Sequence, residues 1–263
     1  MAPAQQGPMF ATSGDAYDRF MGRYSRALAA PFADFAGAGP GQRALDVGCG
    51  PGALTGELVG RLGADGVSAC DPSPSFVTAC AERHPGVDTR LGSAEDLPYA
   101  DGQFDVVAAQ LVLHFVSDTD RAGQQMRRVT RPGGTVAVCV WAFGQGMQLL
   151  RAFWDAAVQL DPDAPDELRD LRYGREGELR GWLSTAGLTQ VVESTISVSS
   201  AYRNFDELWS GLLAGIAPAG AYCVSLSPDR RESLRAALFD RLDRPDGGFT
   251  LDAVARVGRG VRA

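Results

Sequence analysis

The stretch Leu45-Asp46-Val47-Gly48-Cys49-Gly50-Pro51-Gly52 decides how this chain folds. It begins with a short apolar segment, passes an acidic residue and then places glycine at three alternate positions. Glycine adopts left-handed backbone conformations easily and lets a ligand approach the main chain closely. The pattern therefore predicts a strand that turns sharply into a helix beneath a bound nucleoside.

Strand-like and helix-like segments alternate around this stretch, from residue 43 to residue 141. Such alternation is typical of parallel βαβ units. Two of the expected helices begin at capping residues, one at Ser73 before a proline and one at Ser117, where Asp120 resembles the second half of a capping box. The strands that we expect cover residues 44–47, 67–70, 87–91, 104–109 and 135–141.

Beyond residue 141 the regular alternation of strand-like and helix-like segments ends. A helix at 178–186 and long strands at 188–199 and 249–257 continue the core, and we expect a seventh strand antiparallel to the rest. The insertions 143–177 and 201–248 are rich in aromatic residues, and we expect them to form a lid over the carboxyl edge of the sheet. The fold class is thus α/β, a doubly wound Rossmann-like seven-stranded sheet with a lid. Its expected parts are a disordered N-terminus at 1–14, a ligand-binding core at 15–141 and a C-terminal part at 142–263.

The composition narrows the class of partner. The net charge of −7 and the pI near 4.9 oppose nucleic acids and anionic membranes. All 25 basic residues are arginine, so lysine chemistry is excluded. The five cysteines show no C-x-x-C spacing, which predicts neither a disulfide framework nor a metal site. With no targeting segment and no apolar run long enough for a bilayer, we expect a cytoplasmic protein.

The charge of the glycine loop separates two kinds of ligand. The spacing Gly48-x-Gly50-x-x-Ala53, followed by Asp71, also fits a dinucleotide. However, Asp46 would repel a pyrophosphate, whereas it would attract the ammonium and sulfonium charges of S-adenosylmethionine. Asp71 is placed to accept both ribose hydroxyls, and Pro72 beside it offers an apolar edge for adenine. The sequence therefore favours S-adenosylmethionine as the cofactor.

At this point the sequence resembles the class I S-adenosylmethionine-dependent methyltransferases, particularly the small-molecule branch that includes quinone-ring C-methyltransferases. The resemblance covers about residues 14–141 and rests on 45–52, Asp71, 92–98 with 104–107, and 131–134. It implies that Gly48 and Gly50 approach the methionyl group, that Asp71 binds the ribose, and that three further residues contact the cofactor. These are Ser93 and Ala94 at the adenine and Gln110 near the methionyl group. The position of Ser93 is often acidic in the family.

An amphipathic helix is expected at residues 17–28, with Phe20, Met21 and Leu28 facing the core. In similar methyltransferases an N-terminal helix closes over the cofactor, which makes Tyr17, Arg23 and Tyr24 candidate lid residues, with Tyr17 and Arg23 at the cofactor. Aromatic residues in the insertions suggest an acceptor with an apolar or aromatic body. They are Phe153, Trp154, Tyr202, Phe205, Trp209 and Tyr222.

His114 is the candidate general base, because it lies just past the fourth strand, where a methyl acceptor should sit. A packed histidine that only gives shape is an equally good interpretation. We expect His84, beside a proline, to lie at the surface. Methyl transfer from a sulfonium depends on in-line geometry and exclusion of water, so no catalytic side chain is required.

The predicted enzyme transfers a methyl group from S-adenosylmethionine to an oxygen, nitrogen or carbon atom of a small molecule, leaving S-adenosylhomocysteine. Two alternatives stay open at this point. One is an oxidoreductase that uses a nicotinamide dinucleotide, and the other is a protein that binds S-adenosylmethionine without turnover. The acceptor and the oligomeric state are not defined by the sequence.

Overall fold

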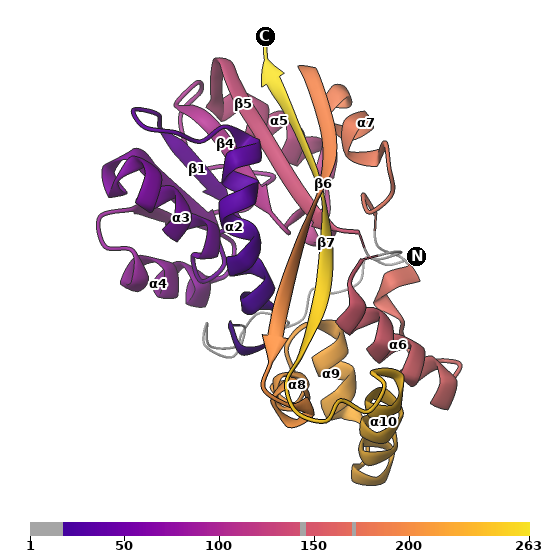
Figure 1. Cartoon of the computed structure of the whole chain (residues 1–263). Coiled ribbons are helices and arrows are strands. Elements are labelled where there is room, and N and C mark those ends of the chain that lie inside the picture. Colours follow the sequence, from indigo (N-terminus) through magenta and orange to yellow (C-terminus); the bar gives the residue numbers. More distant parts are fainter. Residues whose placement is uncertain (1–17, 143–145, 170–171) are drawn as a thin grey trace.

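The computed structural model describes residues 18–142, 146–169 and 172–263. The predictions for residues 1–14 and for Tyr17 lie outside these ranges. A seven-stranded sheet forms the centre, in the order β3-β2-β1-β4-β5-β7-β6 (Figure 1). Its strands are β1 (Ala44–Val47), β2 (Val67–Asp71), β3 (Asp88–Leu91), β4 (Phe104–Gln110), β5 (Thr130–Trp141), β6 (Leu188–Tyr202) and β7 (Phe249–Arg262).

Strands β1 to β5 are parallel to one another, and β7 is antiparallel to both β5 and β6. The predicted doubly wound seven-stranded sheet with one antiparallel strand is therefore confirmed. The order reverses beside β1, because β2 and β4 lie on opposite sides of it. Ligands of open α/β sheets bind at this switch point, beyond the carboxyl ends of the strands.

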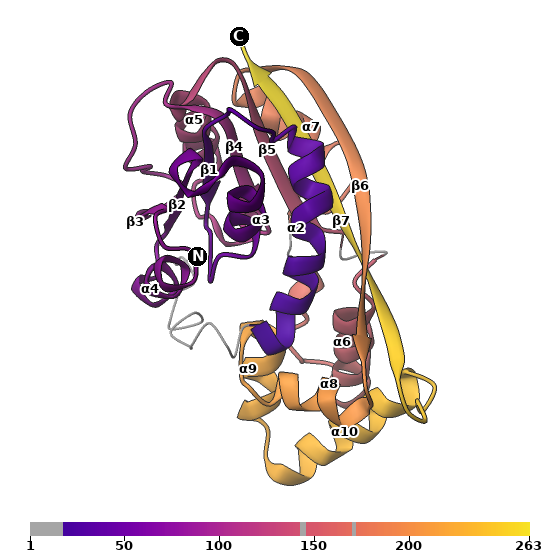
Figure 2. The same cartoon turned by 60° about the vertical axis from the view of Figure 1, so that its left-hand side comes forward.

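Helices cover both faces of the sheet (Figure 2). One face carries α2 (Arg23–Ala36), which follows the π-helical turn η1 (Asp18–Gly22), together with α3 (Ala53–Leu62) and α4 (Pro74–Arg83). The other carries α5 (Thr119–Val129) and α7 (Glu178–Thr185). In β4, Val106 and Ala108 join one core cluster and Val107 and Ala109 the other. This strand reads as an unbroken apolar run because both of its faces are buried.

The hairpin of β6 and β7 extends past the end of β5. Pairing of β5 with β7 stops at Trp141 and Ala255, whereas β6 and β7 stay paired up to Tyr202 and Phe249. The predicted strands 188–199 and 249–257 stop short of the observed ends, which are Tyr202 for β6 and Arg262 for β7. Helices pack around the extension (Figure 1): α6 (Gln148–Leu160), α8 (Phe205–Leu212), α9 (Ala217–Ser225) and α10 (Pro228–Arg241).

Two local predictions need correction. The cap of α5 is Asp118, whose carboxylate accepts the Arg121 N–H at 2.9 Å, and not the expected Ser117 with Asp120. Ser73 precedes α4 as expected, but its hydroxyl makes no cap bond and contacts the hydroxyl of Ser75 at 2.9 Å. Several adjacent small polar residues fit a capping pattern, and the sequence alone does not say which one takes the position.

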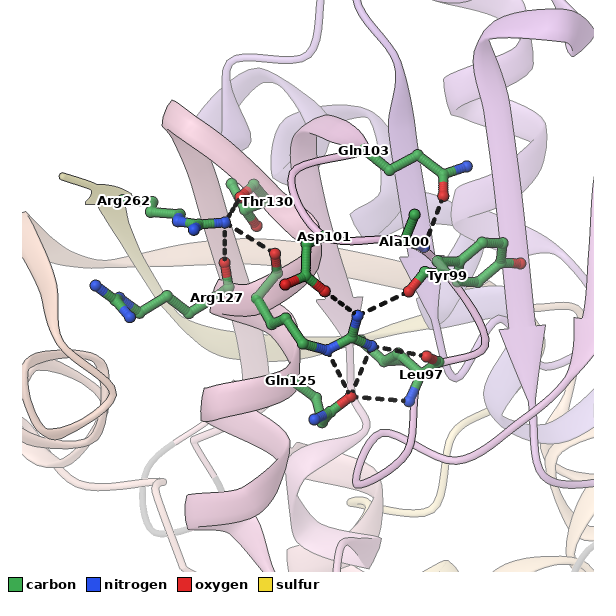
Figure 3. A network of polar contacts seen from close by, with 10 residues as sticks. Leu97, Tyr99, Ala100, Asp101, Gln103, Gln125, Arg127, Thr130 and Arg262 are labelled. Atoms are coloured by element: carbon green, nitrogen blue, oxygen red, sulfur yellow. Dashed lines mark hydrogen bonds and ion pairs between the residues drawn. The ribbon is translucent and has the colours of Figure 1, made fainter.

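An arginine network fastens the segment after β3 to α5 (Figure 3). The Arg128 guanidinium donates to the carbonyls of Leu97 and Tyr99, at 2.9 and 2.8 Å, and pairs with Asp101 at 2.7 Å. Arg262 at the end of β7 donates to the carbonyl of Arg128 at 2.8 Å. These contacts hold the loop between β3 and β4 against the C-terminal end of α5.

Helices α8 and α9 are short, apolar and consecutive in the chain. Within the described ranges, no single helix reaches the length and hydropathy of a membrane span, and this pair reaches them only when counted together across a bend of 88°.

Candidate functional site

The glycine loop joins β1 to α3 and takes the sharp turn that its sequence predicts. Gly48, Gly50 and Gly52 have φ angles of +70°, +52° and +95°, all in the left-handed region. The N–H groups of Gly48 and Cys49 both donate to the carbonyl of Cys70, at 2.8 and 3.0 Å, which fixes the loop to the end of β2. A Cβ atom at Gly48 would lie 2.5 Å from Val112 Cγ2, so only glycine fits there.

A cavity of about 130 Å³ lies beside this loop, at the carboxyl ends of β1, β2 and β4. Four predicted residues besides Pro72 line it, namely Gly48, Gly50, Asp71 and Gln110. Within the described chain its polar walls are acidic or neutral, since no lysine, arginine or histidine contributes to the lining. Five lining residues were not predicted: Ser73, Phe76, Leu111, Val112 and Phe115.

Asp71 organises the loop as well as lining the cavity. Its two carboxylate oxygens accept the N–H groups of Gly50 and Ser73, each at 2.9 Å. Burial raises the pKa of this carboxyl, and the two hydrogen bonds oppose the rise. The carboxylate of Asp71, and not the hydroxyl of Ser73 as the capping prediction expects, makes the side-chain contact before α4. Asp71 can hold the loop and still bind a ligand, because each carboxylate oxygen can accept a second hydrogen bond.

Asp46 lies beneath the loop and not in the cavity wall. Its side chain is 1% exposed, and one carboxylate oxygen accepts the Thr55 hydroxyl at 2.7 Å. The other oxygen, Oδ1, is buried and has no hydrogen-bond partner among the described residues. Burial raises the pKa of Asp46 to about 7. A buried carboxylate with an unsatisfied oxygen is stabilised by a nearby cation. That Asp46 attracts the charged cofactor stays a prediction.

Gln110 connects the cavity to the N-terminal helix. Its amide nitrogen donates to the Ser25 carbonyl at 2.9 Å, and its amide oxygen is buried without a partner among the described residues. An unpaired acceptor at this position favours a ligand group that donates a hydrogen bond. Leu111 follows with a φ of +63°, which turns the chain away from β4 into the lining segment.

Ser93 and Ala94 follow β3 but do not belong to the cavity lining. They lie near it, because the Gly92 N–H donates to the Asp71 carbonyl at 3.1 Å. Ser93 forms an isolated bridge with Asp96, and Ala94 is buried. Their contact with adenine stays a prediction.

The side chain of Arg23 contacts residues of β6 and α8 and not the cavity. Its guanidinium pairs with Glu207 of α8 at 2.8 Å, donates to the Ala201 carbonyl at 3.1 Å and lies 4.2 Å from the centre of the Tyr202 ring. Tyr24 is fully buried, and its hydroxyl lies 3.2 Å from that of Tyr202. These residues join the start of α2 to β6 and α8. Arg23 therefore does not line the cavity, which corrects the prediction that places it at the cofactor.

The two histidines also differ from expectation. His114 does not line the cavity, although its neighbour Phe115 does; it contacts the Arg172 backbone, and burial lowers its pKa to about 4. A group with so low a pKa is a poor general base near neutral pH, so the packed interpretation is favoured. His84 is half-buried, and its ring nitrogen lies 2.9 Å from the Gly52 carbonyl, which corrects the prediction of a surface residue.

The aromatic residues of the insertions pack mainly on one another. Phe153 and Trp154 are fully buried with ring centres 5.1 Å apart, and Trp154 lies 5.5 Å from Tyr222. Phe205 stacks with Trp209 at 6.4 Å. The expectation that this set lines an acceptor pocket is replaced by a core function, since composition alone does not distinguish a pocket wall from a packed core.

The site fits a cationic nucleoside. The glycine loop provides close approach, the unpaired oxygen of Gln110 in the cavity wall is an acceptor for a ligand, and the buried carboxyl of Asp46 beneath the loop favours positive charge nearby. A pyrophosphate finds no basic side chain in the described lining. These features match S-adenosylmethionine better than a dinucleotide.

Comparisons with known proteins agree with this geometry. Residues 45–138 match the family model described as a methyltransferase domain. A demethylmenaquinone methyltransferase of Beutenbergia cavernae is 33% identical over 191 residues, which cover 69% of this chain and 75% of that protein. The chain therefore belongs to the S-adenosylmethionine-dependent methyltransferases of class I. It is an enzyme that uses S-adenosylmethionine to methylate a small molecule, and the dinucleotide and non-catalytic alternatives are not supported.

Solved structures support the same fold. A putative type II methyltransferase from Anaeromyxobacter dehalogenans has a TM-score of 0.63 at 24% identity, covering 90% of this chain and 95% of that one. A phosphoethanolamine N-methyltransferase of Haemonchus contortus, solved with S-adenosylhomocysteine, has a TM-score of 0.58 at 17% identity and covers 95% of this chain and 56% of that one.

Proposed function

We propose that the acceptor is a small, largely apolar molecule with a hydroxylated aromatic ring, of the hydroquinone or phenol type. The relative from Beutenbergia cavernae, named for demethylmenaquinone, supports this class. So do the apolar side chains of Leu111, Val112 and Phe115 in the cavity wall. The net charge of −7 supports a metabolite in preference to a nucleic acid.

The observation that carries the proposal is the negative charge of the cavity lining. Its described walls hold one carboxylate, from Asp71, with the buried Asp46 beneath the loop, and no basic side chain. A neutral acceptor can enter such a field, whereas an anionic acceptor would be repelled. S-adenosylmethionine supplies a methyl group on a positively charged sulfur, which makes that methyl group electrophilic.

The roles that we assign to individual residues follow from their places. Asp71 accepts hydrogen bonds from the ribose hydroxyls, and Gly48 and Gly50 let the nucleoside approach the main chain. Asp46 and Gln110 attract the ammonium group. Ser93 and Ala94, close to Asp71 through the backbone of Gly92, contact the adenine rim. No side chain in this set removes a proton, so the enzyme acts by orientation and exclusion of water.

The helices beyond β5 form the proposed lid. The segments 143–177 and 201–248 contain α6 and α8–α10, which pack at the far end of the β6 and β7 hairpin (Figure 1). The Arg23–Glu207 ion pair at 2.8 Å ties α8 to the start of α2. Closure of these elements would shield the reacting atoms from water.

An acceptor screen tests the proposal. The full chain is incubated with S-adenosylmethionine and matched sets of hydroquinones, phenols, aliphatic amines and carboxylates, and methylated products are detected by mass spectrometry. We expect products from the hydroquinones or phenols, and at least about a tenfold loss of turnover in Asp71→Ala. Products from the amines or carboxylates alone would contradict the proposed acceptor class.

A further inference from the structure

One edge of the central sheet is formed by a long strand. β6 is last in the strand order, and Figure 2 shows its upper part at the outer margin of the sheet. It has 15 residues, and its pairing with β7 is regular from Val192 to Tyr202. Every second residue of an edge strand directs its N–H and C=O groups away from its own sheet, and such a row pairs readily with another strand.

The contacts of β7 show which backbone groups of β6 face outward. Val254 lies opposite Ser197 but is bonded elsewhere. Its N–H donates to the Gly146 carbonyl, and its carbonyl accepts the Ala142 N–H, each at 2.8 Å. In an antiparallel pair, two opposite residues either bond to each other or both face away. The N–H and C=O groups of Ser197 therefore face away from β7, and so do those of every second residue along the regular stretch.

Two arginine side chains mark the ends of this outward row. Arg23 donates to the Ala201 carbonyl at 3.1 Å, and Arg180 donates to the Val191 carbonyl at 3.4 Å. Within the described ranges, no hydrogen bond reaches the outward backbone groups between these two contacts. They belong to Glu193, Thr195, Ser197 and Ser199.

The exposed side chains of this stretch carry no charge. Thr195, Ser197 and Ser199 are exposed, and β6 contains no proline. Its one charged residue is Glu193, whose side chain is only 3% exposed and pairs with Arg256 at 3.2 Å. The charge is therefore turned into the protein and does not keep a second strand away from the edge.

The opposite edge of the sheet is protected in the usual way. β3 has four residues, and it carries the charged pair Asp88 and Arg90, whose side chains are 42% and 46% exposed. Short length and exposed charge both prevent an edge from pairing with another chain. The same chain thus blocks one edge and leaves a long regular stretch of the other available.

We propose that β6 is the interface with a second copy of this chain, paired antiparallel across a two-fold axis at Ile196. Thr195 then lies opposite Ser197 of the second copy, and Glu193 lies opposite Ser199 of the second copy. This register uses every outward group between the two arginine contacts. The two sheets join into one continuous sheet.

A second copy fits this edge because an antiparallel strand is complementary to itself. A two-fold axis places each outward N–H opposite a C=O of the other strand, so the same surface serves both chains. Each chain carries a net charge of −7, which opposes association through most of its surface. The hydroxyl side chains of Thr195 and Ser197 meet without charge repulsion and form a favourable cross-strand pair.

The first experiment measures the mass of the full chain by sedimentation equilibrium over a range of concentrations. We expect the mass to approach twice the 27.8 kDa of one chain. Ser197→Pro removes an outward N–H that makes no bond to β7, so the fold is kept and the dissociation constant of the dimer should rise at least about tenfold. Denaturant unfolding checks that this variant is folded.

A charged pair of variants separates the edge from the rest of the surface. Ser197→Lys brings two like charges close together across the axis and should weaken the dimer at least about tenfold. Ser233→Lys is the matched control, because it makes the same change at an exposed serine of α10, and it should associate like the wild type. This comparison decides the question even if Ser197→Pro unfolds.

Cysteine cross-linking tests the register. All five native cysteines are buried, so a cysteine introduced on β6 is the exposed thiol. Opposite residues of a hydrogen-bonded antiparallel pair have Cα atoms about 5.5 Å apart, which a disulfide spans. A mixture of Thr195→Cys and Ser197→Cys should therefore cross-link on oxidation more than either variant alone.

Two results would overturn the inference: a wild type that stays monomeric at every concentration, or a dimer that both Ser197 variants leave equally stable. The first would assign the edge to a different partner, and the second would place the interface elsewhere on the chain. Equal cross-linking in the mixture and in the separate variants would refute the register at Ile196. None of these measurements depends on the assignment of the cofactor site.

Discussion

The Thr55 hydroxyl donates a 2.7 Å hydrogen bond to one carboxylate oxygen of Asp46 and leaves the other oxygen buried and unpaired among the described residues. Thr55 lies in the first turn of α3, and Asp46 lies in β1, so this contact spans the glycine loop. Burial outweighs the stabilising bond and raises the pKa of Asp46 to about 7. The carboxyl under the loop is therefore poised to change its charge when a cation binds.

The first prediction concerns pH. A bound ammonium or sulfonium group favours ionised Asp46, so the affinity for S-adenosylhomocysteine should rise about tenfold between pH 6 and pH 8. Binding should also release a proton near pH 7, which calorimetry in buffers of different ionisation enthalpy measures. Asp46→Asn should bind more weakly and without this pH dependence. In the free protein the raised pKa adds stability at low pH, and this contribution is lost as the pH rises through about 7.

A second prediction separates Asp71 from a purely structural carboxylate. Asp71→Asn keeps one acceptor oxygen for the two N–H groups of Gly50 and Ser73, so the affinity for S-adenosylhomocysteine should fall by at least about tenfold. Asp105→Asn is the control, since this carboxylate accepts the Arg43 N–H at 2.7 Å and pairs with Arg131, away from the cavity. It should lower the free energy of unfolding by about 1 kcal/mol with affinity unchanged. Equal losses of affinity in both variants would argue against a ligand contact by Asp71.

The glycine loop gives a third prediction, measured by denaturant unfolding. Gly50→Ala meets only the backbone cost of a left-handed residue, about 1–2 kcal/mol, because no atom lies within 4 Å of its new Cβ. Gly48→Ala should cost more, since its Cβ also collides with Val112 at 2.5 Å. Adding Val112→Ala to Gly48→Ala should recover part of that excess. If both alanine variants lose the same stability, the close contact with Val112 is not present in solution.

The core strands and the glycine loop could be predicted from the sequence because a single physical pattern specifies each of them. A strand such as β4, buried on both faces, has to be apolar throughout, and the left-handed turns at Gly48 and Gly50 require glycine. Asp71 and Gln110 were found because they end strands beside the switch point.

Other parts of the site had no such signal. Leu111 adopts a left-handed φ that its residue type does not favour, so the turn that brings Val112 and Phe115 to the cavity was missed. Arg23 was assigned from the family resemblance and the insertion aromatics by residue type, but their partners come from segments far apart in the sequence. Arg23 reaches Glu207, for example, and such pairing follows only from the tertiary fold.

A fourth prediction addresses Arg23. If its role is to tie α2 to α8, Arg23→Gln and Glu207→Gln should destabilise the protein by similar amounts, and the double variant by less than their sum. The expected coupling is about 0.5–1 kcal/mol, because both side chains are 22% exposed. The affinity for S-adenosylhomocysteine should stay within about twofold of the wild type. A large loss of affinity in Arg23→Gln alone would restore the cofactor contact that the sequence predicts.

The last prediction decides the role of His114. Burial lowers its pKa to about 4, so the side chain is neutral at pH 7 and a poor proton acceptor. We expect His114→Gln to keep kcat within about threefold, and the pH–rate profile to show no ionisation that disappears in this variant. The lowered pKa also means that the neutral form stabilises the fold above pH 6.5 and that this contribution is lost as the pH falls through about 4. Stability of the wild type should therefore decrease more steeply on acidification than that of His114→Gln. A loss of kcat of a hundredfold or more in a folded variant would instead identify His114 as the general base, acting after a movement that brings it to the cavity.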